Sequence, residues 1–386
     1  MNTKKRIQAL RERMENQEIE VSIVMNFENQ YYFSGLKALT YSRPIVLVID
    51  KQETALIVPS LEEEHSKEKA NVDRLYVYHE TKLRAEEGRS HLEHLAGIMR
   101  KYPAGTKVGI EFSSFPVKLE RLLEEQGFQL VNLDQPIAEM RYIKDQEEID
   151  LITESGRLVS LAVESSIGNV KAGMTEMEFD QFGTNALFTE VARKHPNATL
   201  DYFAMSPSGL ARTNMPHVFS NTRKLEEQDI LIHSRQVGLN GYRAECERTF
   251  FIGQPTERQK ELFHLVLEAQ LAALDFIKVG VTAKEVNEVA RKIFEKGGVE
   301  EYMNHRTGHG IGIGLHEEPS LRYDNDLVLQ EGMVFCVEPG LYIPDVGGFR
   351  HSDTVVLTKK GTNLITHYPN DLESLIIGDR VGKLSK

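Results

Sequence analysis

The chain has 386 residues, of which 40% are hydrophobic and 27% are charged. This balance is typical of globular proteins and excludes disordered and fibrous classes, and the length predicts two domains. The formal charge of −12 gives no electrostatic basis for binding nucleic acid or an anionic membrane, so we expect neither partner. The charged first residues do not resemble a secretory signal, and two cysteines, Cys246 and Cys336, suit a reducing compartment. We therefore expect a cytoplasmic protein. A single disulfide between the two cysteines stays open as an alternative.

Residues 1–138 are predicted to form an α/β domain. Ile7, Leu10 and Met14 recur at helical spacing, and residues 91–102 and 117–126 are the clearest further helical segments. Short apolar segments typical of strands lie at residues 21–26, 44–50, 53–59, 74–80 and 107–112. Strands that alternate with helices indicate an α/β layer structure. A long helical pattern begins near Arg141, so the second domain is predicted at residues 145–386.

The second region contains an internal repeat. Lys171 to Phe179 resembles Lys278 to Val286, which lies 107 residues further along the chain. In both copies a helical segment ends at glycine, and a new helix begins at threonine with glutamate three residues later, as in a capping box. Two such helix pairs, each followed by strands, predict an α+β domain with pseudo-twofold symmetry. The alternative is that common helix-cap chemistry recurs by chance.

Three histidines, His305, His309 and His316, stand in a glycine-rich segment at residues 304–319. A phosphate-binding loop is rejected, because no strand, turn and helix surround these glycines. Histidines on a backbone that a ligand can approach closely predict a catalytic or metal-binding pocket. The alternative for each is a hydrogen-bonded structural histidine.

Residues 305–319, HRTGHGIGIGLHEEP, resemble the HGTGHGIGLxxHExP signature of the creatinase, aminopeptidase P and prolidase family. Residues 332–344, GMVFCVEPGLYIP, resemble its GMVxxxEPGxY element. The resemblance implies a "pita-bread" catalytic domain, a creatinase-type α/β domain ahead of it, and a homodimer.

Metal-dependent members of that family use two aspartates, one histidine and two glutamates as ligands. In chain order these positions fall on Ser234, Glu245, His309, Glu338 and Ser352. Serines cannot bridge two ions and offset their charge as carboxylates do, so we expect no two-metal centre. One Mn or Zn ion on the three remaining groups stays open as an alternative.

Residues 217–251 resemble creatinase, a family member that works without metal. Its catalytic histidine falls on His217 and the glutamate of its LERT segment on Glu247. The segment Tyr41 to Pro44 is similar to the FGRP stretch of creatinase, whose arginine grips a carboxylate in the neighbouring subunit's pocket. This likeness implies a substrate-binding role for Arg43 and its neighbour Tyr41.

The sequence therefore predicts a metal-independent, creatinase-like hydrolase that needs no cofactor. It cleaves a C–N bond of a small carboxylate-bearing amidine, guanidine or amide. In this prediction His217 is the general base and acid, and paired carboxylates hold a cationic substrate. The predicted catalytic residues are His217, Glu247, Glu338 and His309, and the predicted substrate-binding residues are Arg43, Tyr41, Glu245, His316 and Arg350.

Two other functions stay open. The first is a metal-dependent Xaa-Pro dipeptidase or aminopeptidase with a reduced metal site, in which His217 and His316 steady the peptide. The second is an inactive peptidase fold that serves as a binding module, since fold alone does not fix function.

Overall fold

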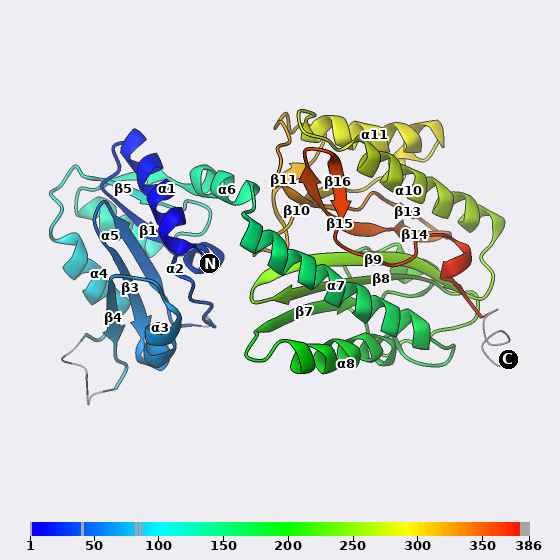
Figure 1. The fold of residues 1–386 in the computed structure, drawn as a ribbon, viewed down its shortest axis with the longest axis horizontal. Helices are drawn as coiled ribbons and strands as arrows, with labels where there is room; N and C mark the ends of the chain where they lie inside the picture. The colour runs from blue at the N-terminus through cyan, green and yellow to red at the C-terminus, as the bar shows by residue number, and fades with distance from the viewer. Residues whose placement is uncertain (1, 40–41, 82–83, 85, 87, 379–386) are drawn as a thin grey trace. The chain divides into compact units, whose positions relative to one another are not determined.

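The computed structural model of the chain describes residues 2–39, 42–81, 84, 86 and 88–378. The chain divides into two units, Met1–Arg141 and Tyr142–Lys386 (Figure 1). Each unit has its own sheet and its own covering helices, so each is described by itself.

The N-terminal unit is built on a six-stranded mixed sheet with the strand order β4-β3-β2-β1-β5-β6. Its strands are β1 (Val21–Val24), β2 (Val46–Asp50), β3 (Thr54–Pro59), β4 (Arg74–Tyr78), β5 (Lys107–Ile110) and β6 (Gln129–Asn132). Strand β2 pairs antiparallel with β1 and β3, whereas β4, β5 and β6 join the sheet in parallel. Its helices are α1 (Thr3–Asn16), α2 (Phe27–Ser34), α3 (Glu63–Lys69), α4 (His91–Met99), α5 (Val117–Glu125) and α6 (Asp134–Tyr142), with a 3-10 turn η1 (Ser60–Glu62).

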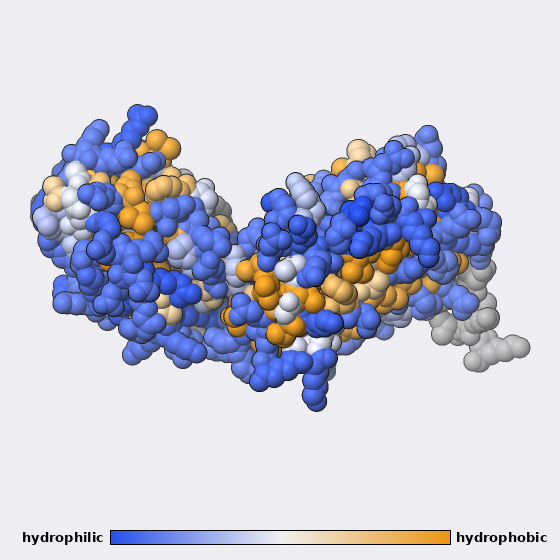
Figure 2. Space-filling view, turned by 90° about the horizontal axis from the view of Figure 1, so that it is seen from above, coloured by the Kyte–Doolittle hydropathy of each residue, from blue (hydrophilic) through white to orange (hydrophobic). Residues whose placement is uncertain are grey.

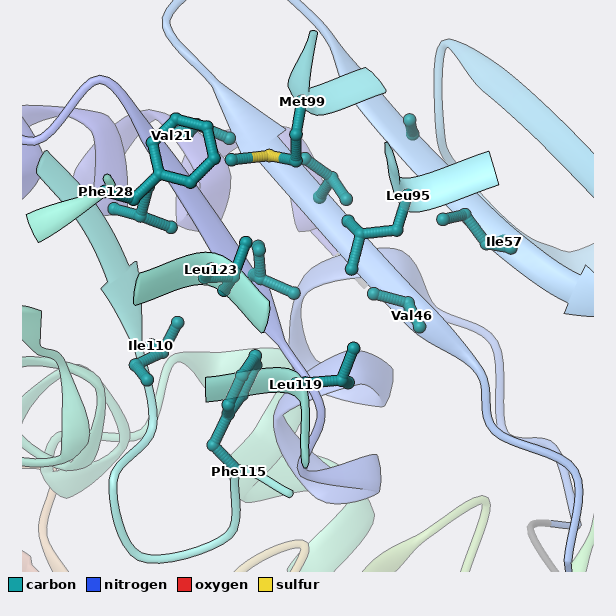
Figure 3. Close-up of a cluster of buried hydrophobic side chains, with 14 of the residues drawn as sticks. Val21, Val46, Ile57, Leu95, Met99, Ile110, Phe115, Leu119, Leu123 and Phe128 are labelled. Atoms are coloured by element: carbon teal, nitrogen blue, oxygen red, sulfur yellow. The ribbon is translucent and has the colours of Figure 1, made fainter. Parts of the chain in front are cut away.

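The core of this unit forms where two helices cover the sheet. Leu95 and Met99 lie one helical turn apart on α4, and Leu119 and Leu123 do the same on α5. Figure 3 shows all four side chains gathered with apolar residues of the central strands. Residues spaced by four share one face of a helix, which explains why these segments become covering helices.

The C-terminal unit is built on a nine-stranded sheet with the order β11-β10-β12-β15-β9-β8-β7, in which β16 pairs with β15 and β17 with β9. Its strands are β7 (Leu200–Met205), β8 (Ile230–Leu239), β9 (Tyr242–Ile252), β10 (Gly308–Gly310), β11 (Glu317–Leu321), β12 (Val334–Val337), β15 (Ser352–Thr358), β16 (Gly361–Leu364) and β17 (Ile376–Ile377). A separate hairpin consists of β13 (Gly340–Ile343) and β14 (Gly347–Arg350).

Two pairs of helices cover the C-terminal sheet, one from each copy of the sequence repeat (Figure 1). The first pair is α7 (Gln146–Asn169) and α8 (Glu176–Lys194), and the second is α10 (Glu257–Phe276) and α11 (Ala283–Lys296). The predicted capping boxes are confirmed. The side chain of Thr175 accepts from the backbone N–H of Glu178, whose own side chain accepts from the backbone N–H of Thr175, and Thr282 and Glu285 make the same pair of bonds. The short elements α9 (Gly209–Thr213), η3 (Glu300–Tyr302) and η4 (Glu373–Leu375) complete the unit. The predicted fold class, an α/β domain followed by a pseudo-twofold α+β domain, is confirmed.

The β8–β9 hairpin sets the register that the site depends on. Asn240 and Gly241 form its two-residue turn, and both have positive φ, as a type I′ turn requires. The turn places Gln236 opposite Glu245 and Ser234 opposite Glu247. Because side chains alternate faces along a strand, these four polar groups share one face.

Hydrophilic side chains cover most of the face shown in Figure 2, with apolar side chains gathered in a few areas of each unit. Among the helices of the described residues, none has the length and apolarity needed to cross a bilayer. Cys246 and Cys336 are buried and free, and burial raises the pKa of the Cys246 thiol to about 12. The bridge that the sequence left open is therefore not formed.

Candidate active site

A cavity of about 350 Å³ opens in the C-terminal unit where the central hairpin meets the glycine-rich loops. Its polar wall comes from β8, β9, β14 and the segments around β10 to β13, and its apolar wall comes from β7 and the loop after α9. It is lined by Phe203, Met205, His217, Val218, Phe219, Ser234, Gln236, Glu245, Glu247, Leu315, His316, Glu338 and Arg350. Six of the nine residues predicted for the site thus line one cavity, and His309 packs against the His316 ring at its wall.

Glu245 is held at the centre of the polar wall. The hydroxyl of Ser352 donates to its Oε1 at 2.8 Å, and the amide of Gln236 donates to its Oε2. Its side chain is almost fully buried, and burial, together with the charge of Glu338, raises the pKa of Glu245. A carboxylate whose charged form is disfavoured in this way gains most from a nearby cation.

His309 presents a bare ring nitrogen to the carboxylates. Its Nδ1 lies 2.9 Å from the carbonyl oxygen of Gly310 and donates to it, which leaves Nε2 free in the neutral ring. Nε2 is buried, makes no hydrogen bond and lies 3.4 Å from Oε1 of Glu338. Burial opposes a charge on the ring, but the carboxylates of Glu338 and Glu245 outweigh it and raise the pKa of His309 to about 9.

Glu247 and Arg350 form a buried ion pair in the same wall. Nη2 of Arg350 donates to Oε1 of Glu247 at 2.8 Å, and its Nε donates to Oε2. Nη1 of Arg350 donates to the Tyr342 hydroxyl at 2.9 Å, and that hydroxyl lies 2.9 Å from Nε2 of His305. Burial and the charges of Glu245 and Glu338 raise the pKa of Glu247 to about 7, against the opposing influence of Arg350. The sequence predicted Glu247 as a catalytic residue and Arg350 as a substrate-binding residue, whereas the structure pairs them with each other.

His316 lies at the outer edge of this wall. Its ring packs at a tilt of 38° against that of His309 with centroids 4.0 Å apart, and its Nδ1 lies 3.4 Å from Nη2 of Arg306. Burial and the nearby charges of His309 and Arg306 lower the pKa of His316 to about 4. The ring is therefore neutral at pH 7.

The loop that carries His217 follows α9 and is fixed by acidic side chains of α8. The Ser220 hydroxyl donates to Asp180, and the backbone N–H of Asn221 donates to Oε2 of Glu176 at 2.9 Å. Glu176 is fully buried, and burial raises the pKa of Asp180. The exposed imidazole of His217 thus reaches the cavity from a loop that several charge-assisted hydrogen bonds hold in place.

The donor set fits one divalent ion. Glu245 belongs to two groups of ligand atoms that lie within 4.8 Å of one another, one with His309 and His316, the other with Glu247 and Glu338. Arg350 already neutralises Glu247, which leaves the charges of Glu245 and Glu338 to match the two charges of a single ion. In the neutral ring, the buried Nε2 of His309 is the nitrogen donor that such an ion needs.

The donor set does not fit a pair of ions. Ser234 and Ser352 stand where metal-dependent family members carry two further carboxylates, and Ser352 is occupied as a donor to Glu245. Without those bridging carboxylates the charge of a second ion has no counterpart in the cavity.

Two of the predicted site residues, Arg43 and Tyr41, belong to the N-terminal unit. Arg43 forms an ion pair with Glu80 at 2.8 Å, with both side chains partly exposed. Tyr41 lies outside the described residues. Their roles in substrate binding stay predictions.

Sequence reasoning missed several cavity residues. Gln236 and Tyr342 were noticed but could not be assigned, because only the strand register places them beside Glu245 and Arg350. The apolar wall of Phe203, Met205 and Phe219 carries no motif. Arg306 did carry a signal, since the family signature has glycine at that position.

Comparison with known proteins identifies both units. Residues 150–359 match the model of metallopeptidase family M24, and residues 6–143 match the creatinase/prolidase N-terminal domain. The chain is 31% identical to the Xaa-Pro dipeptidase of Pyrococcus horikoshii, over 96% of this chain and 99% of that protein. The crystal structure of the prolidase from Pyrococcus horikoshii OT3 superposes with a TM-score of 0.82 at 30% identity, covering 95% of this chain and 99% of that one. The dipeptidase PepE of Mycobacterium ulcerans gives a TM-score of 0.83 at 27% identity, covering 96% and 98%.

These comparisons correct two predictions. The metal-independent, creatinase-like function is wrong, because the similar proteins are named as Xaa-Pro dipeptidases and prolidases. The expectation of no cofactor is wrong as well, because the matching family is one of metallopeptidases. The physical reason is that carboxylate and imidazole donors remain close together although two positions are serines: Nε2 of His309 lies 3.4 Å from Oε1 of Glu338, and Glu245 has ligand atoms within 4.8 Å of both residues. The chain is thus a hydrolase that belongs to metallopeptidase family M24, within the creatinase, aminopeptidase P and prolidase family.

Proposed function

We propose that this chain is a metal-dependent Xaa-Pro dipeptidase whose active site holds one divalent ion. Similarity to proteins named Xaa-Pro dipeptidase and prolidase over nearly the whole of both chains supports the reaction. The observation that carries the proposal is the buried cluster of His309 with Glu245 and Glu338, in which Nε2 of His309 lies 3.4 Å from Oε1 of Glu338 and burial, together with the charge of Glu338, raises the pKa of Glu245. That arrangement is costly for a protein with nothing to bind there.

Glu245, His309 and Glu338 are the residues that would hold the ion. Carboxylate and imidazole donors suit Mn²⁺ or Zn²⁺. When bound, such an ion polarises the substrate carbonyl and lowers the pKa of a water molecule.

Glu247 is the group best placed to move the proton of the reaction. Hydrolysis adds water to the carbonyl carbon, breaks the C–N bond and delivers a proton to the leaving nitrogen. A proton carrier works best when its pKa lies near the working pH, and burial raises the pKa of Glu247 to about 7 in the metal-free protein. Arg350 holds this carboxylate in the cavity wall by two hydrogen bonds, which fixes where the proton is taken and returned.

The remaining walls bind and orient the peptide. His217 stands on its anchored loop at the cavity and can exchange hydrogen bonds with a peptide group. Phe203, Met205 and Val218 form an apolar surface that suits the pyrrolidine ring of proline. The homodimer and the cytoplasmic location stay predictions.

The experiment compares hydrolysis of alanyl-proline with that of alanyl-alanine. Chelator-treated protein should be inactive on both, and Mn²⁺ or Zn²⁺ should restore cleavage of alanyl-proline preferentially. His309→Gln should remain inactive with either ion, whereas Arg322→Gln, a matched change at an exposed arginine paired with Asp324, should behave like the wild type. Turnover that survives complete chelation, or no turnover with any divalent ion, contradicts the proposal.

A further inference from the structure

The guanidinium of Arg306 lies at the edge of the cavity and has no role in the proposed reaction. It precedes β10 and stands where the family signature has glycine. Its side chain is partly buried, and its Nη2 lies 3.4 Å from Nδ1 of His316, a residue of the cavity wall. This chain has therefore placed a long cationic side chain where the signature leaves open space.

The contact with His316 leaves the charge of Arg306 unopposed. An arginine N–H only donates, so Nδ1 of His316 accepts and the ring proton sits on Nε2. Among the residues that the structure describes, no carboxylate oxygen lies within 4.0 Å of the Arg306 guanidinium. An imidazole acceptor orients the guanidinium without neutralising it.

The cavity wall itself offers a substrate anion nothing comparable. Arg350 is the one arginine or lysine among the described residues that line the cavity, and Glu247 and Tyr342 occupy it. The rest of the polar wall is dominated by Glu245, Glu247 and Glu338, which repel an anion. A dipeptide carries a carboxylate at its C-terminus, so a substrate of the proposed class needs a cation at the edge of this wall.

We propose that Arg306, oriented by His316, binds a carboxylate of the substrate and thereby sets the preference of the enzyme. The inference rests on the proposed function. The guanidinium fork matches the two oxygens of a carboxylate, and a lysine ammonium reproduces the charge but not the fork. The carboxylate is either the C-terminal one of a dipeptide or an acidic side chain of its first residue.

Matched substrates with Arg306→Gln separate these sources. The first pair is alanyl-proline and alanyl-prolinamide, which differ in the C-terminal carboxylate. The second pair is glutamyl-prolinamide and glutaminyl-prolinamide, which differ in the side-chain carboxylate. Wild-type protein should favour the acid over the amide in one pair by about 10- to 100-fold in kcat/KM, the effect of a hydrogen-bonded charge.

Arg306→Gln should bring that ratio close to one, and Arg306→Lys should retain an intermediate ratio. Arg322→Gln, which removes the same charge at an exposed position, should keep the wild-type ratio. Ratios in both pairs that are identical in wild type and Arg306→Gln would overturn the inference.

Calorimetric binding keeps the inference separate from the proposed reaction. The four compounds are titrated into metal-free wild type and Arg306→Gln, where no turnover is expected. Loss of the preference for the carboxylate form in Arg306→Gln supports the inference even if no peptide is hydrolysed. Equal binding of acid and amide by the wild type overturns it, whereas failure of the dipeptide assay with every ion counts against the proposed function alone.

Discussion

Replacing Arg350 by methionine should destabilise the C-terminal unit strongly. The side chains of Arg350 and Glu247 are 3% and 2% exposed, so the variant leaves a buried carboxylate without its counterion. Glu245 and Glu338 contribute further negative charge around it. Removing one partner of a buried pair costs about 3–5 kcal/mol of unfolding free energy. For a unit of this size the loss lowers Tm by roughly 6–20 °C.

The loss should depend on pH with a definite sign. A carboxyl whose pKa in the folded protein is raised above that in the unfolded chain loses stability as pH rises through the interval between the two values. Wild type and variant share the loss of stability that Glu247 causes up to its wild-type pKa of about 7. Without Arg350 the pKa of Glu247 rises further, so the deficit should grow from about pH 7 to pH 9. Calorimetric or chemical unfolding across that range measures it.

The matched control is the double variant Arg350→Met with Glu247→Gln, which removes the stranded charge. It should recover more than half of the loss and show no growth of the deficit with pH. A single variant within about 0.5 kcal/mol of the wild type, the range of ordinary surface changes, would refute the reasoning.

Three further predictions concern neighbouring groups. Asp180→Asn weakens the charge-assisted hydrogen bond from Ser220, so it should lower the free energy of unfolding by about 1.5–3 kcal/mol. Because Ser220 belongs to the loop of His217, the variant should also raise KM for alanyl-proline more than it lowers kcat. The same loss of stability with an unchanged KM would show that Asp180 has a structural role alone. In metal-free protein the raised pKa of His309 gives stability that is full below about pH 6.5 and lost as pH rises to about 9; unfolding curves should show this loss, on the order of 3 kcal/mol, in wild type but not in His309→Gln. Ser234→Asp combined with Ser352→Glu restores two carboxylates, so calorimetry should detect a second Mn²⁺ per chain, and unchanged stoichiometry would contradict the assigned cause of the reduced site.

Local patterns in the sequence predicted most of the elements that frame the site. Thr175 and Thr282 begin helices as expected, because a capping box satisfies backbone donors within one turn and needs no tertiary contact. The strands β8 and β9 agree with the strands predicted to follow the first helix pair. Strand β6 and helix α2 were not identified, since both are short and depend on packing against neighbours.

The sequence predicted which residues form the site but not which of them pair with one another. The motifs named His309, Glu338 and Glu245, and these do converge. The letters could not show that Arg350 folds back onto Glu247, because that contact depends on the pairing of β14 with β13 and on the register of β8 with β9. Counting lost carboxylates therefore suggested a metal-free site, whereas the charges that remain after this pairing match one ion.

The central claim is most directly tested by titrating chelator-treated protein with Mn²⁺ while alanyl-proline hydrolysis is followed. The account predicts that activity rises with added ion and reaches its plateau at one equivalent per chain, with calorimetry giving the same stoichiometry. A plateau at two equivalents, or hydrolysis that does not respond to the ion, would contradict it.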